Sequence, residues 1–195
     1  MNAFRLGLST NARPLFRTSQ TPHKTDPRLV VLDTNVLIDA LQSWMLPRGA
    51  RETDLQRLGR VSVEWIEKRR ADLCFSDYIA RELRFVLPRR NVDQRTIEKF
   101  IGDMERLAAR KVIYRPVRST ACGDPADLPI IGTAMAEEPW ASRIITNDQK
   151  LLGMLHYQGV QINHPKFFVG LSRYPGIQPR QEYPSQRDFH PQPGF

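Results

Sequence analysis

Four acidic residues in this sequence stand beside short apolar runs, where several carboxylates could act together. Asp33 ends the run "RLVVL", Asp148 follows "RIITN", Asp127 opens "DLPIIGTA", and Glu82 lies within "SDYIARELRFVL". Converging carboxylates repel one another, so a shared site requires a cation, and hard oxygen donors favour Mg²⁺ or Mn²⁺. Such an ion lowers the pKa of a bound water and neutralises charge on a leaving oxygen. The chemistry implied by these residue types is phosphodiester hydrolysis.

Elements that could bring these acids together follow from the alternation of β-rich and helical patterns. The predicted strands are 28–33, 71–76, 112–117, 142–147 and 160–163. The predicted helices are 34–44, 53–70, 76–87, 92–111, 126–138 and 148–156. Strands separated by helices predict right-handed crossovers and a three-layer α/β/α sandwich with a mainly parallel central sheet. Because ligands bind beyond the carboxyl ends of parallel strands, we expect the four acids to meet at that edge.

Each acid also has a simpler explanation. Three of them directly precede a predicted helix, where an Asp commonly accepts backbone N–H groups as an N-cap: Asp33, Asp127 and Asp148. Glu82 would pair with Arg81 or Arg84 on an exposed helix face, and Asn35 would bond locally in a turn. The occurrence of all the acids just past successive strands favours a shared site over four separate roles.

The segments that carry the acids resemble, in chain order, the four acidic motifs of the PIN domain family. They are "VVLDTNVLIDAL", "SDYIARELRFVL", "DPADLPIIGTAMA" and "IITNDQKLL". The closing "GVQINHPKFFV" resembles the end of the PIN subfamily that comprises the toxin components of toxin–antitoxin systems. The resemblance covers residues 28–169 and implies an α/β/α fold with Mg²⁺- or Mn²⁺-dependent ribonuclease activity.

The resemblance assigns a role to each acid. Asp33 would be the central metal ligand, followed by Glu82, Asp127 and Asp148 as the second, third and fourth acids, all four catalytic.

Three further residues match auxiliary positions of the family. Asn35 and Thr146 match polar positions that hydrogen-bond ligands or the attacking water. Asp124 matches the first acid of an Asp-Pro-x-Asp element, in which Ala126 occupies a slot that is frequently acidic. Either Asp124 or Asp127 would be the direct metal ligand, and the helix-opening position favours Asp127.

Two classes of function remain open at this stage. The first is a metal-dependent endoribonuclease of the toxin type, with RNA as substrate and an antitoxin protein that covers the acids or displaces the metal; a homodimer is a further expectation. The second is a catalytically silent PIN-like module that docks on RNA or a ribonucleoprotein. The complete acid set favours the enzyme, because a binding module gains nothing from clustered negative charge that faces phosphate.

The basic residues divide the chain into three expected parts. The net charge is +8, and residues 1–28 contain five Lys or Arg against one acid. We expect residues 1–27 to be a basic, disordered arm, 28–170 the nuclease domain, and 171–195 a Pro-rich tail. The Arg-rich arm also fits an organellar transit peptide. Within the domain, "EKRR" at 67–70, "PRR" at 88–90 and "RK" at 110–111 are either phosphate contacts or solvated helix ends.

The composition argues against disulfide-rich, zinc-thiolate, membrane and secreted proteins. Cys74 and Cys122 are isolated and lack CxxC spacing, which argues against a disulfide framework or a thiolate zinc site. No apolar run approaches the roughly 20 residues that span a bilayer, and the first residues lack the apolar core of a secretory signal. We therefore expect a cytoplasmic protein with no membrane contact.

Overall fold

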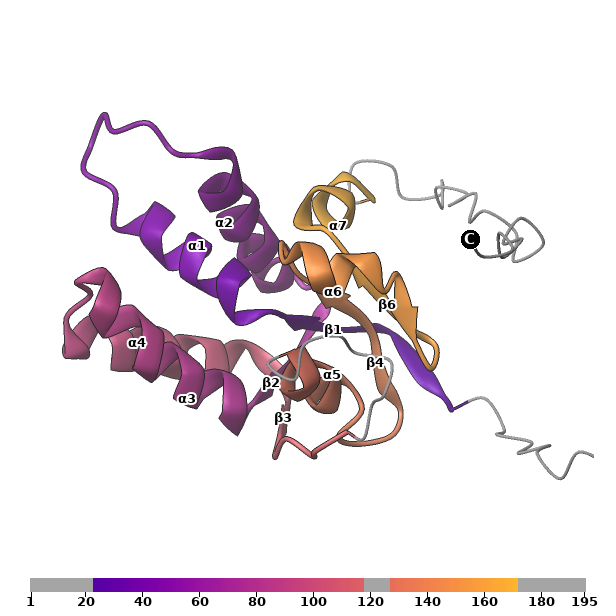
Figure 1. The fold of residues 1–195 in the computed structure, drawn as a ribbon. Coiled ribbons are helices and arrows are strands. Elements are labelled where there is room, and N and C mark those ends of the chain that lie inside the picture. The colour runs from indigo at the N-terminus through magenta and orange to yellow at the C-terminus, as the bar shows by residue number, and fades with distance from the viewer. Residues whose placement is uncertain (1–22, 118–126, 172–195) are drawn as a thin grey trace, which may run out of the picture.

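The computed structural model describes residues 23–117 and 127–171, which form a six-stranded sheet flanked by helices (Figure 1). The strand order is β3-β2-β1-β4-β6-β5. The strands are β1 Thr25–Leu32, β2 Asp72–Ser76, β3 Ala108–Val112, β4 Trp140–Ile145, β5 His156–Tyr157 and β6 Val160–Asn163. Every pairing is parallel except that of β5 with β6. The predicted α/β sandwich with a mainly parallel sheet is confirmed.

Helices cover both faces of this sheet. They are α1 Thr34–Trp44, α2 Asp54–Glu67, α3 Asp77–Val86, the 3₁₀ turn η1 Leu87–Arg90, α4 Gln94–Leu107, α5 Leu128–Ala134, α6 Gln149–Gly153 and α7 Pro165–Leu171. In Figure 1, α2 and α7 lie above β1, whereas α3, α4 and α5 lie below it. Among the described residues, no helix is long and apolar enough to span a membrane.

The two central strands, β1 and β4, end in apolar residues, because helices bury both of their faces there. Val31 and Leu32 of β1 and Ile144 and Ile145 of β4 are all fully buried. Asp33 extends this pairing beyond the end of β1, because its N–H donates to the carbonyl of Ile145 at 2.9 Å. The first predicted acid is therefore fixed to the end of β4 by backbone hydrogen bonding.

Three strands differ clearly from the predicted ones, and one of them is β4, which is Trp140–Ile145 rather than 142–147. β1 begins at Thr25 rather than Arg28, because Thr25 and Asp26 pair with β4 ahead of the apolar run. The third strand, predicted at 112–117, is instead β3 at Ala108–Val112. As the outermost parallel strand, β3 accommodates charged residues such as Lys111, so its pairing with β2 overrides the stronger β propensity of "VIYRPV".

Three elements were not predicted, and the first is the 3₁₀ turn η1. β5 is a two-residue strand that pairs antiparallel with β6 through His156 and Tyr157. α7 begins at Pro165, and the N–H of Lys166 donates to Nδ1 of the preceding His164. Pro at the first helical position is a signal that the sequence does contain.

A close approach joins α1 and α2. A Cβ on Gly59 of α2 would lie 2.6 Å from the carbonyl oxygen of Val36 and 2.7 Å from the backbone nitrogen of Ala40, both on α1. Any side chain at this position would separate the helices, so glycine sets their distance.

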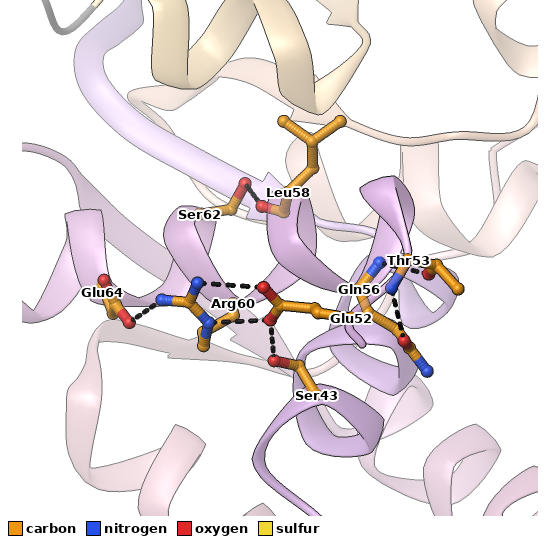
Figure 2. Close-up of polar contacts among 8 residues, drawn as sticks. All are labelled: Ser43, Glu52, Thr53, Gln56, Leu58, Arg60, Ser62 and Glu64. Carbon is orange, nitrogen blue, oxygen red and sulfur yellow. Dashed lines mark hydrogen bonds and ion pairs between the residues drawn. The ribbon is translucent and has the colours of Figure 1, made fainter. Parts of the chain in front are cut away.

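Polar contacts hold the same pair together (Figure 2). Arg60 of α2 donates to both carboxylate oxygens of Glu52 at 2.9 and 3.1 Å, and to Glu64 at 2.5 Å. Ser43 of α1 donates to the same Glu52. These hydrogen bonds, that from Arg60 first, lower the pKa of Glu52 to about 2. The segment between the helices is thereby tied to both of them.

The proposed limits of the folded unit stay a prediction. Residues 1–22 of the arm and 172–195 of the tail lie outside the described residues.

Candidate active site

Asp33 is directed toward the end of β4 and does not cap the helix that it precedes. It occupies the N-cap position of α1, but its side chain accepts no capping hydrogen bond. Its Oδ2 instead accepts a hydrogen bond from Oγ1 of Thr146 at 2.7 Å, and the residue is 6% exposed. The capping explanation therefore does not account for this carboxylate.

Thr146 connects three parts of the carboxyl edge of the sheet. It is fully buried, and its Oγ1 both donates to Asp33 and accepts the N–H of Asp148 at 2.9 Å. Its own N–H donates to the carbonyl of Asn163 at the end of β6. This threonine fixes the orientation of Asp33 relative to Asp148.

Asp148 does cap its helix. Its Oδ1 accepts the N–H groups of Lys150 at 2.7 Å and Leu151 at 3.2 Å, which are orphan donors of α6. The charge of the same carboxylate also raises the pKa of Asp33. Asp148 therefore both caps α6 and lies close enough to Asp33 to raise its pKa.

Glu82 reaches the same region from α3. Its Oε2 accepts a hydrogen bond from Oγ1 of Thr34 at 2.6 Å, directly beside Asp33 in the chain. The neighbouring arginines have other partners, since Arg81 pairs with Asp77 and Arg84 pairs with Glu98. The surface pairing considered for Glu82 is not formed.

The environment of Asp33 raises its pKa to about 6. Burial is the largest cause, and the negative charges of Glu82 and Asp148 add to it, while the hydrogen bond from Thr146 acts in the opposite direction. Within the described residues, no Lys, Arg or His forms an ion pair with Asp33 or Glu82. The carboxylates of Asp33 and Glu82 are therefore not neutralised by an ion pair within the described part of the chain.

The hydrogen bonds given above for Asp33, Glu82 and Asp148 do not involve Asp127. It stands at the N-cap position of α5, where its side chain makes no capping hydrogen bond. Asp124 and Ala126 lie outside the described residues. The choice between Asp124 and Asp127 as a ligand stays open.

The donor chemistry fits a divalent cation, although the carboxylates are not gathered around one point. In the described ranges, no group of three or more His, Cys, Asp or Glu side chains is close enough to hold a metal ion. Two contacts account for this spacing: Thr34 holds Glu82, and Asp148 faces the start of α6. Mg²⁺ needs only one or two protein carboxylates, because waters and substrate phosphates complete its shell. The metal-ligand roles of the four acids stay a prediction.

Several polar residues at this edge were not predicted from the sequence. Thr34 and Asn147 are direct chain neighbours of Asp33 and Asp148, so adjacency was the available signal. Tyr78 lies one helical turn before Glu82, and its pKa is raised by burial and then by the charge of Glu82. Its ring lies 5.5 Å from that of Tyr114.

The basic residues predicted to contact phosphate lie at different distances from the acidic edge of the sheet. Arg69 and Arg70 precede β2 and therefore lie at the edge opposite the acids. Arg110 donates to the carbonyls of Glu137 and Pro139. Arg90 is different, because it lines a pocket together with Asp148.

A comparison of the sequence with models of known protein families identifies the family of this chain. The model of the PIN domain matches residues 29–150, which is more than half of the chain. The chain belongs to the PIN domain family. The PIN domain is a nuclease-type fold, and the match contains the β1 end with Asp33, the α3 residue Glu82 and the β4 end with Asp148. A comparison with curated proteins found no match.

Proposed function

We propose that this PIN domain protein is a metal-dependent endoribonuclease that hydrolyses RNA phosphodiester bonds. The observation that carries the proposal is the buried carboxylate of Asp33, which faces the charges of Glu82 and Asp148 and forms no ion pair within the described part of the chain. A buried carboxylate with like-charged neighbours is costly, and such perturbed groups cluster at functional sites. A divalent cation at this edge would remove that cost.

Each residue at the edge has a defined task in this proposal. Asp33, Glu82 and Asp148 would hold the cation, with Asp127 as the predicted fourth acid. When bound, Mg²⁺ or Mn²⁺ supplies a water of lowered pKa and neutralises charge on the leaving oxygen. Thr146 holds Oδ2 of Asp33 and so fixes the orientation of this carboxylate, while the hydroxyl of Thr34 orients Glu82.

Proton release would accompany metal binding. The folded-state pKa of Asp33 is about 6, so at pH 5 to 6 part of the population carries a proton there. Since a carboxylate must be deprotonated to bind a metal, Asp33 would lose that proton on binding. Asn35 is exposed in the first turn of α1 and would donate its amide to the substrate or the attacking water.

We further propose that the protein is the toxin component of a toxin–antitoxin system and acts in the cytoplasm. Support comes from the closing segment "GVQINHPKFFV", which resembles that subfamily and forms β6 and the start of α7. An antitoxin protein would silence the enzyme by covering the acidic edge, and the active unit would be a homodimer.

RNA cleavage with Mg²⁺, with Mn²⁺ and with EDTA tests the activity. We expect cleavage with either metal, none with EDTA, and a loss of several orders of magnitude in Asp33→Asn. Asp54→Asn is the matched control, because Asp54 is an exposed acid in the first turn of α2. A fully active, metal-dependent Asp33→Asn enzyme would refute the assigned site.

The second candidate is a PIN-like module that binds RNA or a ribonucleoprotein without cleaving it. The absence of a three-acid group among the described residues favours this alternative. It predicts RNA binding by the intact protein with no cleavage under either metal, and Asp33→Asn would then leave binding near the wild-type level.

A further inference from the structure

A pocket of about 570 Å³ lies beside the acids on the α1 side of the sheet edge. We call it the side pocket. Its walls come from Ile38 and Asp39 of α1, Leu55 of α2, Arg90 of η1, and Asn147 and Asp148 before α6. Its volume falls in the range of about 300 to 1,000 Å³ that is typical of ligand sites. Because Asp148 belongs both to the side pocket and to the acidic edge, a chain bound at the acids passes this opening.

The polar wall of the side pocket is fixed by one hydrogen bond. Nδ2 of Asn147 donates to Oδ2 of Asp39 at 2.7 Å. This bond orients the amide, and among the described residues Oδ1 of the half-buried Asp39 carboxylate accepts no hydrogen bond. Arg90 also lines the pocket, and its positive charge acts on Asp39.

The apolar wall suits a flat ring. Ile38 and Leu55 line the pocket, and 45% of the surface of Leu55 is exposed. Leu55 belongs to the α2 end that Gly59 and the Arg60 contacts hold against α1 (Figure 2). The distance between Ile38 of α1 and Leu55 of α2 is therefore set by the packing of these two helices.

The charges do not select a phosphate as the occupant. The pocket is lined by two carboxylates, Asp39 and Asp148, and two cations, Arg90 and Lys150, so it offers no excess of positive charge. The pocket instead offers a carboxylate acceptor beside a guanidinium donor, with apolar side chains between them. Single-stranded RNA is recognised in this way, since unstacked bases pack on side chains and expose their Watson–Crick edges.

We propose that the side pocket binds a guanine base of the RNA substrate, with Asp39 accepting its N1–H and N2–H and Arg90 donating to O6. This assignment rests on the proposed function, since it names the base that the nuclease holds beside its acids. Guanine presents two adjacent N–H donors to a carboxylate. Adenine, cytosine and uracil each place an acceptor next to their donor, so Asp39 would repel part of every other base.

Binding of short RNAs tests the side pocket separately from catalysis. The probes are fluorescein-labelled nine-residue oligouridines in which one guanosine is moved through each position, with adenosine, cytidine or inosine as replacements. Affinity is measured by anisotropy in EDTA, where no cleavage occurs. We expect one position to prefer guanosine by roughly 5- to 150-fold, and inosine, which lacks the 2-amino group, to lose most of that preference.

Variants locate the preference in the pocket. Asp39→Asn should abolish the guanosine preference, and Arg90→Gln should weaken guanosine binding more than adenosine binding. The matched control is Arg95→Gln, an exposed residue outside the pocket, which should weaken all probes equally. Thermal melting monitors the fold of Asp39→Asn, and Arg90→Gln and the inosine probe keep the test decisive if that variant unfolds.

The outcomes separate this inference from the proposed activity. Equal affinity for all probes, or no binding of any probe, would overturn the guanine assignment even if the enzyme cleaves RNA. A guanosine preference that Asp39→Asn removes would support the assignment even if neither Mg²⁺ nor Mn²⁺ gives cleavage, and the nuclease proposal would then fall alone.

Discussion

Asp33 combines burial with two like-charged neighbours, and this fixes how the metal-free protein responds to pH. Its folded-state pKa of about 6 exceeds its ordinary value of 3.8, so the folded state holds the proton more tightly than the unfolded state does. Stability should therefore fall as the pH rises from about 4 to 6 and stay constant above that range. The total change attributable to this residue is about 3 kcal/mol.

Asp33→Asn should remove that dependence. In EDTA at pH 7 we expect the variant to be more stable than the wild type by up to about 3 kcal/mol, because no buried charge remains. At about pH 3 the two proteins should be nearly equal, since Asp33 is then mostly neutral in both the folded and unfolded states. Urea unfolding at pH 3, 5 and 7 measures the difference, and a pH-independent difference would contradict the assigned ionisation.

At the residue scale, the sequence predicted that Asp33 and Asp148 lie at one edge of the sheet, but not how their carboxylates are held. Asp33 and Asp148 follow from the rule that parallel strands share a carboxyl edge. The bond from Thr34 to Glu82 spans 48 positions in the chain and depends on the placement of α3, so it could not be predicted locally. Asp148 caps its helix and Asp33 does not. This difference likewise depends on Thr146, because its hydrogen bond directs the Asp33 carboxylate toward β4.

At the element scale, the contact between α1 and α2 depends on Gly59. Gly59→Ala should destabilise the fold by about 1 to 3 kcal/mol, because the added methyl meets backbone atoms of Val36 and Ala40 that cannot move aside. The control is Gly102→Ala in α4, whose Cβ would meet only the end of the Arg106 side chain at 3.5 Å. That change should stabilise by up to about 1 kcal/mol through helix propensity. Chemical denaturation of both variants measures this contrast, and equal effects would contradict the close approach.

The elements were predictable where one local signal dominated. The periodicity of α1 gives Thr34–Trp44 directly, and the run "ADLCFS" gives β2. The third strand was misplaced because β propensity favours 112–117, whereas pairing with β2 selects Ala108–Val112. β5 is too short to leave a periodic pattern, and its existence depends on the turn that returns it to β6.

For the whole molecule, the net charge of +8 predicts salt-dependent RNA binding. Residues 1–22 carry Arg5, Arg13 and Arg17 without an acid. Removing them should reduce the slope of log affinity against log salt concentration by up to about 2, while cleavage of saturating RNA persists. Binding titrations between 50 and 300 mM KCl measure the slope, and an unchanged slope would assign these arginines another role.

The central position of β1 has a consequence for the time at which activity arises during synthesis. β1 leaves the ribosome early, but β4, its neighbour on one side, begins at Trp140, and the hydrogen bond from Thr146 to Asp33 spans 113 positions. Because such distant pairings form only once both partners exist, a nascent chain that stops short of β4 has no assembled acidic edge. In the proposed nuclease, the acidic edge would therefore be incomplete for most of translation, and the RNA machinery that makes the protein would not meet an active, partly finished enzyme.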